Sequence, residues 1–140
     1  MIALDTNVIA ELMRAQPAPA VVEWVNRQSA ATLYLTTMTL AEIRFGLAAM
    51  PEGQRKDALT NTFENGIRPL FTDRILTFNE DASHAYARLR ADARSNGTSI
   101  SNADALITAT VRAHDFAIAT RDTAPFLTAG LRVINPFSPS

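Results

Sequence analysis

The sequence predicts an α/β fold with a mostly parallel five-stranded sheet that helices cover on both faces. Two observations carry this prediction: short apolar runs recur along the chain, and segments with apolar residues at helical spacing separate them. Alternation of this kind is typical of parallel sheets, because a helix between two strands returns the chain to the same end of the sheet. The runs that we expect to form strands are 2–5, 33–37, 75–78, 116–120 and 131–134.

Each segment between these runs carries its own helix signals. After a helix from about 8 to 14, a break at 16–19 ends in Pro19, whose fixed φ suits the first position of a new helix. Asn79 can cap a long helix that stops at the Asn96-Gly97 pair. The other expected helices contain Leu40, Ile43 and Leu47; Leu59, Phe63 and Ile67; and Leu106, Ile107 and Val111, the last of them beginning at Ser101-Asn102.

The composition indicates one globular domain, which we expect to span residues 1–140. Hydrophobic residues make up 47% and charged residues 19% of the chain, so it can bury a core and is not of the disordered class. The absence of cysteine excludes disulfides, thiolate zinc sites and cysteine nucleophiles. No apolar run approaches the roughly 20 residues of a membrane helix, and no basic leader is present, so we expect a cytoplasmic protein without a membrane partner.

Four acidic side chains fall where the ends of the expected strands bring residues together. Asp5 follows the first strand, Glu42 lies shortly after the second, and Asp122 follows the fourth. Asp104 lies in the first turn of the helix that leads into the fourth strand. In open α/β sheets, ligands bind beyond the carboxyl ends of the strands. If these strands are neighbours in the sheet, the carboxylates converge in one crevice.

Converging carboxylates cannot all stay ionised without a positive counter-charge. A set of oxygen ligands suits Mg²⁺ or Mn²⁺, since such ions bind a few carboxylates, several waters and the substrate phosphate. These ions activate water for in-line attack on phosphorus. The acids therefore predict a metal-dependent hydrolase of phosphodiester bonds. Bound cations would also offset the formal net charge of −1, which otherwise disfavours a nucleic-acid partner.

A structural interpretation of the same acids stays open at this point. The segments 39–42 and 101–104 both have the spacing of a capping box, in which an acid reaches back to the amide that begins its helix. Asp5 and Asp122 can each cap the helix that follows them. Acids in such places are stabilised by roughly 0.3–1 kcal/mol through the helix dipole. An acid at such a position, taken alone, is more often a cap than a metal ligand.

Four motifs follow one another along the chain: D-T-N-V-I at 5–9, T-x-A-E at 39–42, A-D-A-L-I-T-A-T at 103–110 and A-T-R-D-T at 119–123. This ordered set resembles the motifs of PIN-domain ribonucleases, in particular the bacterial VapC and FitB-like toxins of toxin–antitoxin pairs. The resemblance covers essentially the whole chain. It implies a PIN-like three-layer α/β/α fold and Mg²⁺- or Mn²⁺-dependent endoribonuclease activity on RNA. It also implies a homodimer and a cognate antitoxin, a small DNA-binding protein, that blocks the site.

The resemblance assigns roles to single residues as well. The side chains that it implies as catalytic and metal-binding are Asp5, Glu42, Asp104 and Asp122. The hydroxyls of Thr6 and Thr120 would orient these carboxylates. The side chains of Arg44 and Arg121 would contact RNA phosphate. One departure concerns a second metal ion, because many family members have asparagine in place of Asp122 and an acid where this chain has Pro125. Asp122 either binds a second ion or tunes the first.

Two other functions compete with this hypothesis. A haloacid-dehalogenase-type phosphatase also begins with a strand that ends on aspartate, but it needs a second aspartate two residues later, where this chain has Asn7. A non-catalytic PIN-fold interaction module would keep the acids as caps and use its apolar helices for partner contacts. Such a module is expected to have lost at least one of the four acids, and this chain has all of them.

Overall fold

The computed structural model describes residues 1–138 and, within them, one five-stranded sheet. Its strands are β1 (Ile2–Leu4), β2 (Leu33–Thr36), β3 (Ile75–Leu76), β4 (Ala117–Ala119) and β5 (Val133–Ile134). Their order is β3-β2-β1-β4-β5, and every neighbouring pair is parallel. In the central strand, Ile2 pairs with Leu33 on one side and with Ala117 on the other. The predicted parallel sheet is therefore confirmed, with β1 and β4 as neighbours.

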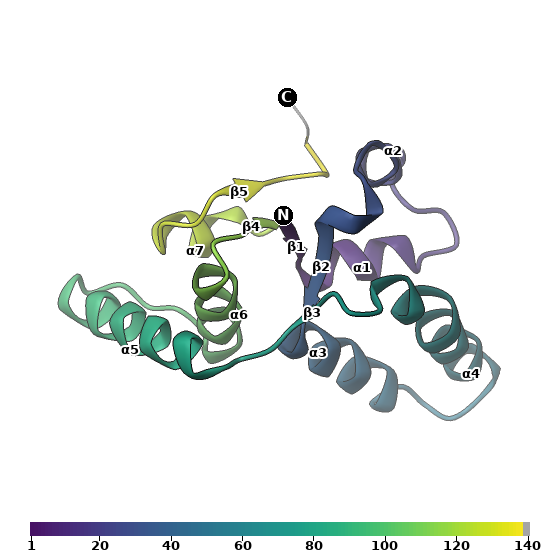
Figure 1. Cartoon of the computed structure of the whole chain (residues 1–140). Helices are drawn as coiled ribbons and strands as arrows, with labels where there is room; N and C mark the ends of the chain where they lie inside the picture. The colour runs from purple at the N-terminus through teal and green to yellow at the C-terminus, as the bar shows by residue number, and fades with distance from the viewer. Residues whose placement is uncertain (139–140) are drawn as a thin grey trace.

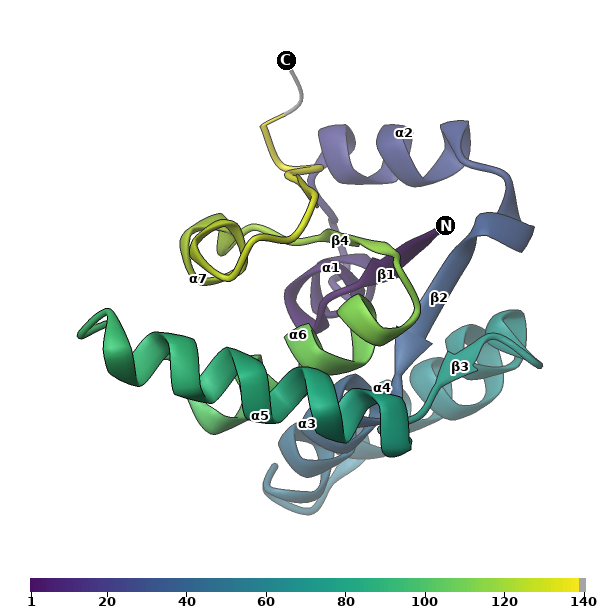
Figure 2. The ribbon, with the colours of Figure 1, turned by 60° about the vertical axis from the view of Figure 1, so that its left-hand side comes forward.

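Helices cover both faces of this sheet. They are α1 (Thr6–Leu12), α2 (Pro19–Arg27), α3 (Thr37–Ala48), α4 (Gln54–Asn61), α5 (Glu80–Ser95), α6 (Asn102–Ala113) and α7 (Thr123–Thr128). Figure 1 shows α1 to α4 on one side of the strands and α5, α6 and α7 on the other, which confirms the three layers α/β/α. The long α5 packs along α6 on the outside of the molecule (Figure 2). None of the described helices is long and apolar enough to cross a membrane.

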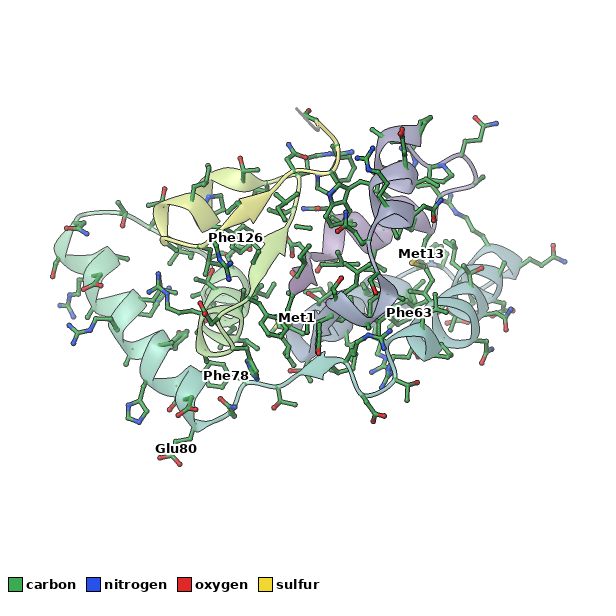
Figure 3. The ribbon with its side chains drawn as sticks, turned by 45° about the horizontal axis from the view of Figure 1, so that its top comes forward. Met1, Met13, Phe63, Phe78, Glu80 and Phe126 are labelled. Atoms are coloured by element: carbon green, nitrogen blue, oxygen red, sulfur yellow. The ribbon has the colours of Figure 1, made fainter. Side chains whose placement is uncertain are left out.

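Alternate residues of the strands contribute to two separate cores, because successive side chains of a strand point to opposite faces. Leu4 packs in one core with Phe63 and with buried side chains of α1, α2 and α3. Its neighbour Ala3 packs in the other core with Ile107 of α6 and Phe126 of α7. Figure 3 shows Phe63 and Phe126 on opposite sides of the strands. The sheet is thus buried on both faces, and its carboxyl-terminal edge stays available for a site.

Local sequence signals set several helix ends where they were expected. The Asn79 side chain caps α5 by accepting a hydrogen bond from the amide of Ala82 at 2.9 Å. Pro19 is the first residue of α2, where its missing N–H costs no hydrogen bond. Gly97, with φ of 68°, follows the last residues of α5 in the left-handed conformation that glycine adopts without strain.

Other boundaries differ from the expected ones. The strand expected at 75–78 is only two residues long, because the chain turns away so that Asn79 can cap α5. The first helix begins at Thr6 rather than near residue 8, since Asp5 already accepts the Thr6 amide as its cap. The helix expected around Phe63 is interrupted, with α4 followed by a π-helical segment at 62–67 and a 3-10 turn at 68–71.

Candidate active site

Asp5 occupies the centre of the carboxyl-terminal edge, directly after β1, and only 6% of it is exposed. Its Oδ1 accepts a hydrogen bond from the amide of Thr6 at 2.8 Å. Its Oδ2 accepts one from the hydroxyl of Thr120 at 2.9 Å. No ion pair joins Asp5 to a basic side chain anywhere in residues 1–138. This carboxylate is therefore buried and hydrogen-bonded without a cation beside it.

The pKa of Asp5 is raised from 3.8 to about 6. Burial is the main cause, since it penalises the charged form, while the hydrogen bonds from Thr120 and Thr6 oppose it. The charges of Glu42 and Asp104 raise the pKa further. The charges of these two acids therefore act on Asp5, while a joint site of all four carboxylates stays a prediction.

Glu42 reaches this edge from the second turn of α3. Its Oε1 accepts a hydrogen bond from the hydroxyl of Thr6 at 2.7 Å. The capping box considered for residues 39–42 is wrong, because α3 begins earlier and its cap is Thr36, whose hydroxyl accepts the amide of Thr39 at 3.1 Å. Glu42 therefore has no part in capping its own helix, and Thr6 orients it toward the neighbourhood of Asp5.

Asp104 and Asp122 approach from the other side of β1. Ser101 caps α6 and accepts the amide of Asp104 at 3.1 Å, which confirms the serine half of the capping box expected at 101–104. Burial raises the pKa of Asp104, and the charge of Asp122 adds to this effect. Asp122 precedes α7, but its side chain makes no cap hydrogen bond. The side chain of Asp122 therefore does not cap α7, which is the structural role that the sequence left open for it.

The donor set fits a hard divalent cation on its chemistry, because every candidate ligand is a carboxylate oxygen. Within residues 1–138, no three Asp, Glu or His side chains lie close enough together to hold an ion jointly. Mg²⁺ usually keeps several waters and uses one or two protein carboxylates. Asp5 and Asp104 are the two acids that we expect to hold such an ion, and their role as ligands stays a prediction.

Thr120 and Asn7 lie behind the acids. The Thr120 hydroxyl is completely buried and donates to Asp5, the orienting role that the resemblance implied for it. Asn7 was not among the predicted site residues, yet its Nδ2 lies 3.1 Å from Thr120 Oγ1 and 3.4 Å from Asp5 Oδ2. The sequence signal that could have pointed to Asn7 is its place in the D-T-N-V-I motif, two residues after Asp5.

The two candidate RNA-contacting arginines have protein partners in the structure. The Arg44 guanidinium pairs with Glu64 at 3.0 Å on the surface. The Arg121 guanidinium lies 3.5 Å from Glu11 Oε1, and its central carbon is 3.9 Å from the centre of the Phe137 ring. Both side chains remain exposed, so their contact with RNA phosphate stays a prediction.

Residues 2–130 match the family model described as the PIN domain. This chain belongs to the PIN-domain family. It is 51% identical over all 140 residues to a protein of Sinorhizobium fredii named VapC ribonuclease Y4jK, and the match covers the whole of that protein. It is 42% identical over 137 residues to the toxin FitB of Neisseria gonorrhoeae, covering 98% of this chain and 99% of FitB.

Solved structures agree with this assignment. The crystal structure of FitAcB from Neisseria gonorrhoeae contains a chain that superposes on this PIN domain with a TM-score of 0.92 at 42% identity, covering 98% of this chain and 99% of the other. DNA-bound VapBC from Salmonella typhimurium superposes with a TM-score of 0.79 at 19% identity, covering 96% and 97% of the two chains, and shows the same fold. The PIN-like fold and the VapC- and FitB-like resemblance that the motifs predicted are confirmed.

Proposed function

We propose that this PIN-domain protein is a Mg²⁺- or Mn²⁺-dependent endoribonuclease that acts as the toxin of a toxin–antitoxin pair. The observation that carries the proposal is the state of Asp5: buried, close enough to Glu42 and Asp104 to feel their charges, and without a basic partner in the described residues. A buried carboxylate in this position is stabilised when a dication binds. A relative of 51% identity whose name is VapC ribonuclease supports the choice of RNA as the substrate.

In this proposal Asp5, directly after β1, and Asp104, in the first turn of α6, would be the residues that hold the ion. The hydroxyl of Thr6 keeps Glu42 turned toward them, so that Glu42 orients the ion or its waters. Asp122, whose charge acts on Asp104, tunes that ligand or binds a second ion. A bound dication would supply the positive charge that lowers the pKa of the attacking water and neutralises the scissile phosphate.

The comparisons also support a partner. Solved structures that are similar to this chain at 41–42% identity include FitAcB and FitAB bound to a DNA fragment, so a small DNA-binding antitoxin is the partner that we propose. We propose a homodimer for the toxin itself. Light scattering on the purified chain tests that state directly, and a monomer at micromolar concentration would contradict it.

The test of the activity uses a single-stranded RNA with a fluorophore and a quencher at its ends. We expect cleavage in Mg²⁺ or Mn²⁺ and none in EDTA. Asp104→Asn should lower the rate at least about a hundredfold, because a ligand of the ion is lost. Asp81→Asn is the matched control, since Asp81 is also an acid in the first turn of its helix but is exposed on α5.

The rivals give different results in the same assay. A non-catalytic interaction module would leave RNA intact in every metal, and the parent protein and Asp104→Asn would then behave alike. A phosphatase of the haloacid-dehalogenase type would release phosphate from small phosphomonoesters. Its second aspartate is replaced here by Asn7, whose side chain is tied to Thr120 and to the backbone of Arg121. We therefore expect no such release.

A further inference from the structure

We propose that Asn7 is a positioning residue of this site, because its side-chain amide fixes the direction in which the Thr120 hydroxyl points at Asp5. Asn7 belongs to α1, whereas Thr120 lies in the loop between β4 and α7. The Asn7 amide thus joins the two segments that meet behind the acids. The effect of Asn7 on metal binding rests on the proposed metal-dependent function. Its geometry rests only on hydrogen bonds within the protein.

A backbone donor determines which way the Asn7 amide is turned. The N–H of Arg121 can only donate, and it donates to Asn7 Oδ1 at 3.1 Å. The oxygen of the amide therefore faces the loop, and its nitrogen faces Thr120 and Asp5. From there Nδ2 donates to Thr120 Oγ1 at 3.1 Å.

The direction of the Thr120 hydroxyl then follows by elimination. A hydroxyl has one O–H donor and two lone pairs. Both lone pairs face groups that can only donate, namely Asn7 Nδ2 and the amide of Asp122, each at 3.1 Å. The O–H is left to donate to Asp5 Oδ2, where the distance is 2.9 Å. Thr120 is completely buried, so no solvent competes for this hydroxyl.

The result is a one-way chain of hydrogen bonds from the backbone of Arg121, through Asn7 and Thr120, to Asp5. Beside this chain, Asn7 Nδ2 makes a longer direct contact of 3.4 Å with Asp5 Oδ2. Because the amide of Thr6 holds the other oxygen of Asp5, both oxygens of that carboxylate are fixed. Without Asn7, the Thr120 hydroxyl gains a free lone pair and the loop loses a tie to α1. Partners of this kind change metal affinity by about 10–100-fold in proteins.

Glu11 provides a matched control on the same helix. It lies one turn after Asn7 and also holds Arg121, but through the guanidinium, which is 3.5 Å from Glu11 Oε1. The change Glu11→Gln therefore weakens a second anchor of the same loop and leaves the bonds between Asn7, Thr120 and Asp5 in place. A purely structural role for Asn7 would make the two substitutions alike.

The first experiment measures the Kd for Mn²⁺ by calorimetry on the full chain without RNA. Asn7→Ala and Thr120→Val should each weaken binding about tenfold, and the double variant should also be about tenfold weaker, because both changes break one chain. Glu11→Gln should stay within about twofold of the parent. A double variant that is about a hundredfold weaker, an unchanged Asn7→Ala, or a Glu11→Gln loss as large as that of Asn7→Ala would each overturn the proposal.

Two further measurements keep the test sharp if a variant folds poorly. Thr120→Ser retains the hydroxyl and should restore the parent Kd that Thr120→Val loses; failure to restore it counts against the proposal. In the metal-free parent, NMR should show the Thr120 hydroxyl proton protected from exchange, and rapid exchange of that proton would overturn the geometry. A parent protein that binds no Mn²⁺ overturns the proposed function, and the NMR result then still decides the hydrogen-bond chain by itself.

Discussion

Two buried carboxylates at opposite ends of α1 meet opposite environments. Asp5, before the helix, has no basic partner among the described residues, and burial raises its pKa to about 6. Glu11, at the other end, is 4% exposed, accepts the amide of Ala18 at 2.8 Å and pairs with Arg14 at 3.1 Å. The pKa of Glu11 is lowered, by the Ala18 amide first and by Arg14 and Arg121 as well.

The difference shows that burial does not by itself distinguish a functional acid from a structural one. The counter-charge does, because a buried acid with its own cations contributes to the fold, while one among like charges costs stability until a cation arrives. Glu11 ties α1 to the start of α2 and to the β4–α7 loop. The charges of Glu42 and Asp104 raise the pKa of Asp5, and we therefore expect the metal at the Asp5 end of α1.

Among substitutions that test the difference between Asp5 and Glu11, we expect Asp5→Asn to change the stability of the protein most. Removing the buried charge should stabilise the metal-free protein at neutral pH, because a pKa raised from 3.8 to about 6 corresponds to a cost of at most ~3 kcal/mol. We expect a gain of ~1–3 kcal/mol in the free energy of unfolding, since the amide also disturbs the bond from Thr120. Urea unfolding in EDTA measures it. A loss of stability would mean that Asp5 serves chiefly as a cap.

The pH dependence of the same variant fixes the cause. The folded pKa of Asp5 is raised, so the native state binds a proton more tightly than the unfolded chain, and the parent gains stability as pH falls from about 6 toward 3.8. The gain in free energy of unfolding that Asp5→Asn brings should therefore be largest above about pH 6 and should vanish near about pH 4, because the pKa of Asp5 differs by about 2 units between the folded and unfolded states. A constant difference across this range would exclude the charge as its origin.

Mn²⁺ should remove the cost that the Asp5 charge imposes. At a concentration about a hundred times its Kd, the ion should stabilise the parent by about 2.7 kcal/mol through ligand linkage. Protons compete with the cation for Asp5, so the stabilisation should grow as pH rises through about 6. Thermal melts with and without Mn²⁺ measure this shift, with Asp104→Asn as the variant that should lose it and Asp81→Asn as the variant that should keep it.

The sequence predicted the arrangement of the fold well, because that arrangement follows from local patterns. Five apolar runs, Pro19, Asn79 and Gly97 all mark element ends through chemistry that acts within a few residues. The positions of the acids after their strands also followed, since parallel strands end at one edge. Strand lengths were overestimated, as at 75–78, because a following cap competes for the last residues of a strand.

What the sequence did not predict depends on contacts between distant segments. The capping box at 39–42 was plausible locally, but Glu42 instead accepts a bond from Thr6, 36 residues away in the chain. The role of Asn7 was missed for the same reason, because its partner Thr120 lies 113 residues away in the chain. A carboxylate or amide in a helix gives no local sign of such a partner.

Glu11→Gln tests the structural end of the comparison. The amide can still accept from Ala18, but it loses the charge that pairs with Arg14 and Arg121, so we expect the Tm to fall by about 3–6 °C. The folded pKa of Glu11 is lowered, so its contribution is present above its ordinary pKa of 4.5 and is lost as pH falls below it. The penalty of Glu11→Gln should accordingly shrink in acid. If Glu11→Gln instead stabilised the protein at neutral pH, the charge of Glu11 would cost stability, as we expect for the charge of Asp5.

The smallest effect should come from Glu23→Gln, which separates pairing from burial. Glu23 pairs with Arg27 at 3.3 Å on α2, but the two side chains are 71% and 55% exposed. Water screens such a pair, and its entropy cost cancels much of its attraction, so we expect a Tm change below about 1 °C. Scanning calorimetry of Glu23→Gln beside Glu11→Gln compares the same substitution in two ion pairs. If both shift the Tm equally, then the guanidinium partner alone, and not the burial of Glu11, accounts for its stabilising role.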